Sequence, residues 1–326
     1  MLVNSLLILL GFALLIKGAD WLVSGSSALA KKYRVSDLAI GLTIVAFGTS
    51  APELVVNAFA SVNKHQEIVF GNVIGSNNFN LFMILGLAGL ISPLVVQSST
   101  VWKEIPLSLL AAIMLFVFAN DYFFGASAIL NRTESLVLLA MFVLFLLYVY
   151  KQLKTDPAQP QIEVKKISVS KIALFIVIGL AGLVIGGQLV VTQAVAMAAA
   201  LGVSEKIIGL TIVAMGTSLP ELATSVVAAF KKNNDIAVGN IIGSNIFNVF
   251  FILSVSGLIN PIPYDKVFNT DLYLLILGTV LLFGFMFSGQ KRKLDRWEAA
   301  ILLLIYIGYT AYLVIRETNS IEAEVL

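Results

Sequence analysis

The sequence predicts an all-α membrane protein, with ten transmembrane helices arranged as two inverted-topology five-helix repeats. Three observations predict this fold: an apolar composition, ten apolar runs of membrane-spanning length, and a long segment that occurs twice. Of the 326 residues, 59% are hydrophobic and 12% charged, and the mean hydropathy is +0.95. A soluble domain carries about 25% charged residues. The composition therefore indicates a chain folded within a lipid bilayer.

The ten apolar runs are each about 20 residues or longer, as a helix needs to cross a bilayer. They cover 2–30, 37–62, 67–91, 104–119, 133–151, 169–200, 206–230, 235–259, 270–288 and 297–315. Between the fifth and the sixth runs lies "QLKTDPAQPQIEVKKIS", whose prolines and charges indicate a linker. The chain therefore divides into a first repeat (1–151), a linker (152–168) and a second repeat (169–326).

Basic residues predict the orientation of the chain. Ten spans place both termini on one side, where the loops hold five Lys and Arg residues, whereas the loops on the other side hold 15. The positive-inside rule then predicts a plasma-membrane protein with a cytoplasmic linker and both termini outside. Within the first run, Lys17 and Asp20 are three residues apart, and we expect a local ion pair.

The internal repeat is found by placing 38–85 over 206–253, a constant shift of 168 residues. The two segments share 27 identical residues in 48 positions without a gap. Each half contains an odd number of spans, so the second half enters the membrane from the opposite side. Inverted repeats are typical of secondary transporters, whose binding site lies near the bilayer midplane between the repeats.

Two copies of one motif, "GTSAPE" and "GTSLPE", lie inside apolar runs. Glycine and proline loosen or break a helix, and a glutamate within a span indicates a functional site. Carbonyls freed by a break, hydroxyls and carboxylates are hard oxygen ligands, which suit Na⁺ or Ca²⁺ rather than zinc or copper. The motifs predict helix breaks at Gly48, Pro52, Gly216 and Pro220, and cation ligands at Thr49, Ser50, Glu53, Thr217, Ser218 and Glu221.

A second duplicated motif, "GSNNFN" and "GSNIFN", adds further oxygen ligands. Its serine and second conserved asparagine are four residues apart, on one helical face; these are Ser76 and Asn80, and Ser244 and Asn248. Asn77 and Asn245 lie off that face, where we expect them to satisfy backbone groups of the broken helices. The two glutamates carry a formal charge of −2, which balances one Ca²⁺ or two Na⁺.

The paired motifs resemble the α-repeats of the cation/Ca²⁺ exchanger superfamily, specifically its prokaryotic Na⁺/Ca²⁺ exchangers, and the resemblance covers nearly the whole chain. It implies alternating access, with helices one and six sliding against the other eight. It also implies Ca²⁺ extrusion driven by Na⁺ influx, usually three Na⁺ for one Ca²⁺. By motif position, Glu53 and Glu221 are the central ligands and Asn80 and Asn248 line the middle. The resemblance assigns flanking Na⁺ ligands to the side chains of Thr49, Ser50, Ser76, Thr217, Ser218 and Ser244, and to the backbone carbonyls of Ala46 and Ala214.

One position departs from the pattern of several branches of this superfamily, which carry Asp where this chain has Asn248. The missing carboxylate argues against K⁺ dependence and leaves both Na⁺ and proton coupling open. Because the single histidine, His65, lies in a polar loop away from the acids, Na⁺ is the favoured driving ion. An antiporter of H⁺ and Ca²⁺ or another divalent cation is the alternative, and a cation channel is a further one.

The remaining expectations concern partners. No Asp pair, Ser/His pair or His cluster lies within the spans, so an enzyme is not expected, nor is a cofactor. The net charge of +2 gives no sign of a nucleic-acid partner. Na⁺ and Ca²⁺ are expected as transported ions in a lipid bilayer, with the chain functional as a monomer.

Overall fold

The computed structural model describes residues 1–120, 128–155, 168–203, 212, 214–289 and 291–325. Within these residues, eight helices are long and apolar enough to cross a membrane, and one further pair of helices makes a bent span. The prediction of a helical, multi-pass membrane protein is confirmed. The seventh predicted span, 206–230, lies partly outside the described residues, so the count of ten stays a prediction.

The helices and strands follow one another in the same order in the two halves. In the first half they are α1 (Leu2–Tyr33), α2 (Asp37–Ile40), η1 (Gly41–Val45), α3 (Ala46–Thr49), α4 (Ala51–Val62), α5 (Gln66–Asn78), η2 (Phe79–Ile84), α6 (Leu85–Ile91), β1 (Leu94–Val95), η3 (Thr100–Glu104), α7 (Ile105–Ala119), β2 (Ile129–Leu130) and α8 (Arg132–Thr155). In the second half they are α9 (Val169–Ala200), α11 (Ala214–Gly216), α12 (Leu219–Phe230), α13 (Asn234–Phe247), η5 (Asn248–Leu253), α14 (Ser254–Ile259), β3 (Ile262–Pro263), η6 (Lys266–Phe268), α15 (Asn269–Phe285), β4 (Lys293–Leu294) and α16 (Arg296–Val325).

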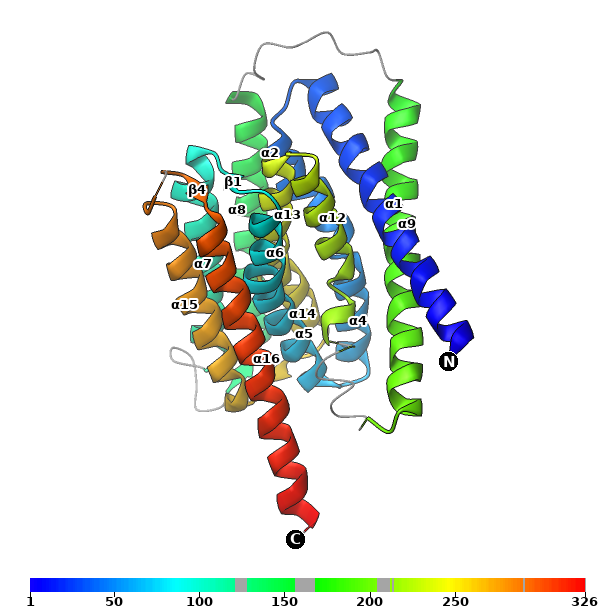
Figure 1. The fold of residues 1–326 in the computed structure, drawn as a ribbon. Coiled ribbons are helices and arrows are strands. Elements are labelled where there is room, and N and C mark those ends of the chain that lie inside the picture. The colour runs from blue at the N-terminus through cyan, green and yellow to red at the C-terminus, as the bar shows by residue number, and fades with distance from the viewer. Residues whose placement is uncertain (121–127, 156–167, 204–211, 213, 290, 326) are drawn as a thin grey trace.

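The two longest complete helices, α1 and α9, lie side by side at one edge of the molecule (Figure 1). Their backbones touch at glycines. A Cβ added to Gly18 would lie 2.7 Å from the carbonyl oxygen of Gly179, and one added to Gly179 would lie 2.7 Å from the backbone nitrogen of Leu22. Small residues permit this approach between membrane helices, where packing drives association.

A polar contact joins α1 to the α12–α13 turn. Asp20 Oδ1 lies 2.6 Å from Lys231 Nζ, and 4.0 Å separates Asp20 Oδ2 from Lys17 Nζ. The ammonium of Lys231 also donates to Ser24 Oγ at 2.8 Å. The expected partner of Asp20, Lys17, is thus the more distant of two, and the closer partner comes from the other half of the chain.

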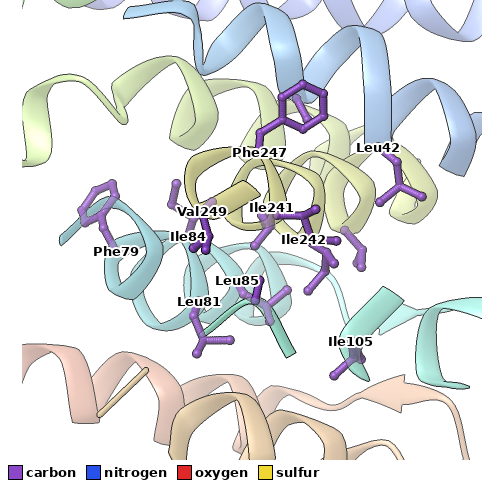
Figure 2. Close-up of a cluster of buried hydrophobic side chains, with 14 of the residues drawn as sticks. Leu42, Phe79, Leu81, Ile84, Leu85, Ile105, Ile241, Ile242, Phe247 and Val249 are labelled. Carbon is purple, nitrogen blue, oxygen red and sulfur yellow. The ribbon is translucent and has the colours of Figure 1, made fainter. Parts of the chain in front are cut away.

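Two nearly continuous helices, α5–η2–α6 and α13–η5–α14, pass through the middle of the molecule. Every residue from Ile236 to Phe247 is buried. Figure 2 shows apolar side chains of these helices packed between them, including Ile84 and Leu85 on one side and Ile241 and Ile242 on the other. The core therefore holds the middle of both helices rigidly in place.

Both central helices change to π-helical geometry at the same point of the repeat: η2 begins at Phe79 and η5 at Asn248. π-Helical turns within α-helices are frequent at functional sites.

The outer helices begin with matching caps. At the start of α8, the backbone nitrogen of Asn131 donates to Glu134 Oε2 (2.8 Å), and that of Glu134 donates to Asn131 Oδ1 (3.0 Å), which forms a capping box. At the start of α16, the backbone nitrogen of Asp295 donates to Glu298 Oε2 at 2.7 Å. These caps satisfy backbone donors that lipid would leave unpaired.

Short strand pairs connect the two halves. The β1–β4 pair places Leu94 opposite Leu294, and the β2–β3 pair places Leu130 opposite Ile262, both antiparallel. Both chain termini lie toward the same end of the molecule, and α9 begins at the opposite end (Figure 1).

Candidate ion-binding site

The two GTSxPE segments each interrupt a helix at the serine. The first bends the chain by 47° between α3 and α4, where Ser50 has φ −82° and ψ 6°. The second has nearly the same geometry, with Ser218 at φ −89° and ψ 7°. Pro52 and Pro220 lie in the first turn of the helix that follows, where no backbone donor is needed. Gly48 lies in α3 before the first break, and Gly216 ends α11 before the second.

The glutamates that follow these breaks are buried, and each is 1% exposed. Their serine partners come from the opposite repeat. Ser218 Oγ donates to Glu53 Oε1 at 3.1 Å, and Ser50 Oγ donates to Glu221 Oε1 at 2.8 Å. The two broken helices therefore meet at their breaks, and each carboxylate is held by the other half of the chain.

The predicted serines of the central helices lie beside the serines of the breaks. Ser76 Oγ is 3.0 Å from Ser218 Oγ, and Ser244 Oγ is 3.0 Å from Ser50 Oγ. Both are fully buried. Four serine hydroxyls thus surround the two carboxylates in two pairs related by the sequence repeat.

A lattice of four asparagines joins the two central helices. Asn77 Nδ2 donates to the carbonyl oxygen of Asn245 (3.2 Å), and Asn245 Nδ2 donates to that of Asn77 (3.3 Å). Asn80 Nδ2 donates to Asn245 Oδ1 at 3.0 Å, and Asn248 Nδ2 donates to Asn77 Oδ1 at 2.9 Å. The expectation that Asn77 and Asn245 satisfy the broken helices is wrong, because they bind each other's backbone across the central pair.

The lattice determines which atoms of Asn80 and Asn248 remain available. Their amide groups are engaged as donors, so their carbonyl oxygens are left over. Four buried oxygens have no hydrogen-bond partner among the described residues at this centre: Glu53 Oε2, Glu221 Oε2, Asn80 Oδ1 and Asn248 Oδ1. Such a set of acceptors is unfavourable when empty and complements a cation.

The threonines of the two motifs lie beside asparagines that were not predicted as site residues. Thr49 Oγ1 is 2.9 Å from Asn240 Oδ1, and Thr217 Oγ1 is 3.1 Å from Asn72 Oδ1. Asn72 and Asn240 are 168 residues apart, four residues before Ser76 and Ser244. This i, i+4, i+8 stripe of Asn, Ser and Asn was the signal that could have found them.

The two predicted backbone ligands precede the breaks. The carbonyl of Ala46 accepts from the backbone nitrogen of Ser50 (2.9 Å) and lies 3.3 Å from Thr49 Oγ1, so the break does not free it. One lone pair of that carbonyl remains for a cation. Ala214 begins α11, the turn before the second break.

The arrangement defines a buried oxygen site between two duplicated, broken helices. The model of the family described as "Sodium/calcium exchanger protein" matches residues 3–151 and 171–315. The chain belongs to the sodium/calcium exchanger family, as its paired motifs predict, and is a multi-pass membrane protein of the cation/Ca²⁺ exchange class.

Among particular relatives, the chain is 39% identical to "Putative antiporter CaxA" of Alkalimonas amylolytica, over 95% of this chain and 98% of that one. It is 33% identical to "Sodium/calcium exchanger MaX1" of Methanosarcina acetivorans, again over 95% and 98%. A solved structure of the sodium-calcium exchanger NCX_Mj, soaked with Na⁺, superposes with a TM-score of 0.81 at 35% identity, covering 95% of this chain and 98% of that one.

Proposed function

We propose that this chain is a secondary antiporter that exchanges Na⁺ for Ca²⁺ by alternating access. The observation that carries the proposal is the set of four unpartnered buried oxygens contributed by Glu53, Asn80, Glu221 and Asn248. Two carboxylates with two amide oxygens suit a hard divalent cation. The same carboxylates with the flanking hydroxyls suit Na⁺ in its place.

Charge is the proposed reason that the two ions take turns. The site carries a formal −2, which one Ca²⁺ or two Na⁺ neutralises and a third Na⁺ makes net positive. A buried carboxylate without a counter-charge costs several kcal/mol. An empty or half-filled site therefore resists being carried past apolar surface, whereas a filled site does not. This coupling needs no cofactor and no covalent chemistry, so the chain acts as a transporter and not as an enzyme.

The architecture proposed for this function is ten spans in two inverted repeats, with α1 and α9 sliding as a pair. The glycine contacts between these two helices favour their moving together. Their polar contacts to the rest of the protein include the ion pair of Asp20 with Lys231, at the end of the molecule where the basic loops lie. With that end in the cytoplasm and both termini outside, the chain lies in the plasma membrane and works as a monomer.

The decisive experiment measures ⁴⁵Ca²⁺ uptake into proteoliposomes loaded with Na⁺, K⁺ or choline, with and without a pH gradient. Na⁺/Ca²⁺ exchange requires uptake that depends on internal Na⁺ and is lost in Glu53→Gln. Glu134→Gln is the matched control, since this buried carboxylate caps α8 outside the site. Uptake driven only by the pH gradient would replace Na⁺ with H⁺ as the coupling ion. Uptake that needs no gradient would indicate a channel and refute alternating access.

A further inference from the structure

Asn240 lies on α13, fully buried, and its side-chain amide has a single satisfactory orientation. Its Nδ2 donates to Ser225 Oγ at 2.9 Å and to the backbone carbonyl of Glu221 at 3.3 Å. The carbonyl can only accept, and the Ser225 hydroxyl is 3.4 Å from the carbonyl of Ala237, its own acceptor. The amide nitrogen must therefore face these two groups, and the amide oxygen must face Thr49.

The amide oxygen of Asn240 dictates where the Thr49 hydroxyl hydrogen points. Three acceptors surround Thr49 Oγ1: Asn240 Oδ1 at 2.9 Å, the Val45 carbonyl at 3.1 Å and the Ala46 carbonyl at 3.3 Å. An amide oxygen cannot donate, so two oxygens 2.9 Å apart are attractive only when the threonine hydrogen lies between them. A threonine in a helix usually donates to a carbonyl three or four residues earlier. Here the nearest acceptor comes from the other repeat.

This direction changes what the hydroxyl offers. With its hydrogen given to Asn240, Thr49 presents oxygen lone pairs to the space beside the Val45 and Ala46 carbonyls. Without Asn240, the same hydrogen would turn to one of those carbonyls or to Glu221, which lies within hydrogen-bonding reach of Thr49. It would then occupy a lone pair that a cation needs.

The second repeat has the same arrangement. Thr217 Oγ1 lies 3.1 Å from Asn72 Oδ1, and Asn72 Nδ2 donates to Asn57 Oδ1 at 2.9 Å. Asn57 occupies the repeat position of Ser225, so each straight helix orients its amide with a polar residue of the broken helix from its own half. Each amide then acts on the threonine of the opposite half.

We propose that Asn240 and Asn72 are positioning residues for Na⁺: they take the hydroxyl hydrogens of Thr49 and Thr217, so that these oxygens face the ion as acceptors. The inference rests on the proposed function, and it concerns the flanking Na⁺ sites alone. The four unpartnered oxygens that suit Ca²⁺ belong to other residues. Loss of either asparagine therefore weakens Na⁺ binding selectively.

The test compares Asn240→Leu and Asn72→Leu with Asn78→Leu. Asn78 is a buried asparagine of α5 whose amide donates to the backbone of Asp271, away from the site. The Na⁺ concentration for half-maximal exchange should rise about 5-fold in the first two variants, the effect of losing one ordinary hydrogen bond. Half-maximal Ca²⁺, measured as Ca²⁺/Ca²⁺ exchange without Na⁺, should stay within about 2-fold, and Asn78→Leu should change neither ion's value.

A second measurement shows whether the asparagine acts through the threonine. In a Thr49→Val background, Asn240→Leu should add no further shift in Na⁺ dependence. Parallel losses for Na⁺ and Ca²⁺, or an unchanged Na⁺ dependence, would overturn the inference while leaving Na⁺/Ca²⁺ exchange intact. If the buried Asn240 variant does not fold, the half-buried Asn72 with Thr217→Val decides the question by the same criterion. A wild-type protein without Na⁺-dependent uptake would instead refute the proposed function itself.

Discussion

Two adjacent glycines of α9 test how tightly this helix packs on α1. A Cβ added at Gly186 would lie 2.8 Å from the carbonyl oxygen of Gly11 and 2.9 Å from the backbone nitrogen of Leu15. Ordinary contact begins at 3.4 Å, so Gly186→Ala must move the helices apart by about 0.6 Å. At Gly187 the nearest atom is Pro220 Cδ, 3.8 Å away, so an alanine fits there without displacement.

Helix propensity favours alanine by about 1 kcal/mol at both positions, so it cancels in the comparison. Overpacking costs about 1–3 kcal/mol, which is therefore the expected difference in stability between the variants. We expect Gly186→Ala to unfold at a lower temperature in detergent than Gly187→Ala, measured by tryptophan fluorescence. Neither glycine lies among the ion-binding residues, so both variants should retain exchange. Coincident midpoints, or a less stable Gly187→Ala, would refute the idea that backbone contact limits this packing.

Three further predictions concern ion binding and transport. Glu53→Gln and Glu221→Gln should each weaken Ca²⁺ binding by at least about 100-fold, because removing one buried charge of a set costs about 3–5 kcal/mol; calorimetry on purified protein measures this, and a much smaller loss in either variant would contradict the central assignment. Lys231→Gln and Asp20→Asn should each change the exchange rate by no more than about 5-fold, since half-exposed ion pairs contribute about 1 kcal/mol or less; the two changes should not add in the double variant, and full additivity would show that the contact does not hold α1. Exchange should proceed equally with choline or K⁺ as the other cation, because Asn248 leaves the site one carboxylate short of the K⁺-dependent pattern, and a K⁺ requirement in flux assays would contradict this.

The helical repeat and the polar residues at its centre were predictable because they depend on composition and periodicity. A glutamate and a proline within an apolar run violate the rules for a lipid-facing helix so strongly that Glu53 and Glu221 stand out from the sequence alone. Serines and asparagines four residues apart then define the facing surface. Pairwise identity over a shift of 168 residues adds the symmetry.

The partners of these residues were not predictable, because they come from distant parts of the chain. Asp20 has Lys17 three residues away, yet its closer partner is Lys231, which tertiary packing brings to the same place. Asn77 and Asn245 were expected to serve the broken helices, but the close approach of α5 and α13 makes each the acceptor for the other's side chain. The π-helical starts of η2 and η5 have no propensity signal, since they accommodate this packing rather than a local preference.

Crossed pairing makes the two halves of the site interdependent. Ser50 of the first half holds Glu221 of the second, and Ser218 holds Glu53, so neither half completes a carboxylate environment alone. The amide oxygens of Asn80 and Asn248 are likewise oriented by asparagines of the opposite half. A cation that draws in one carboxylate therefore pulls on a serine of the other broken helix, and through it on the second carboxylate. In a site so connected, partial occupancy strains both halves, and this is why we expect ion exchange to proceed between fully neutralised states.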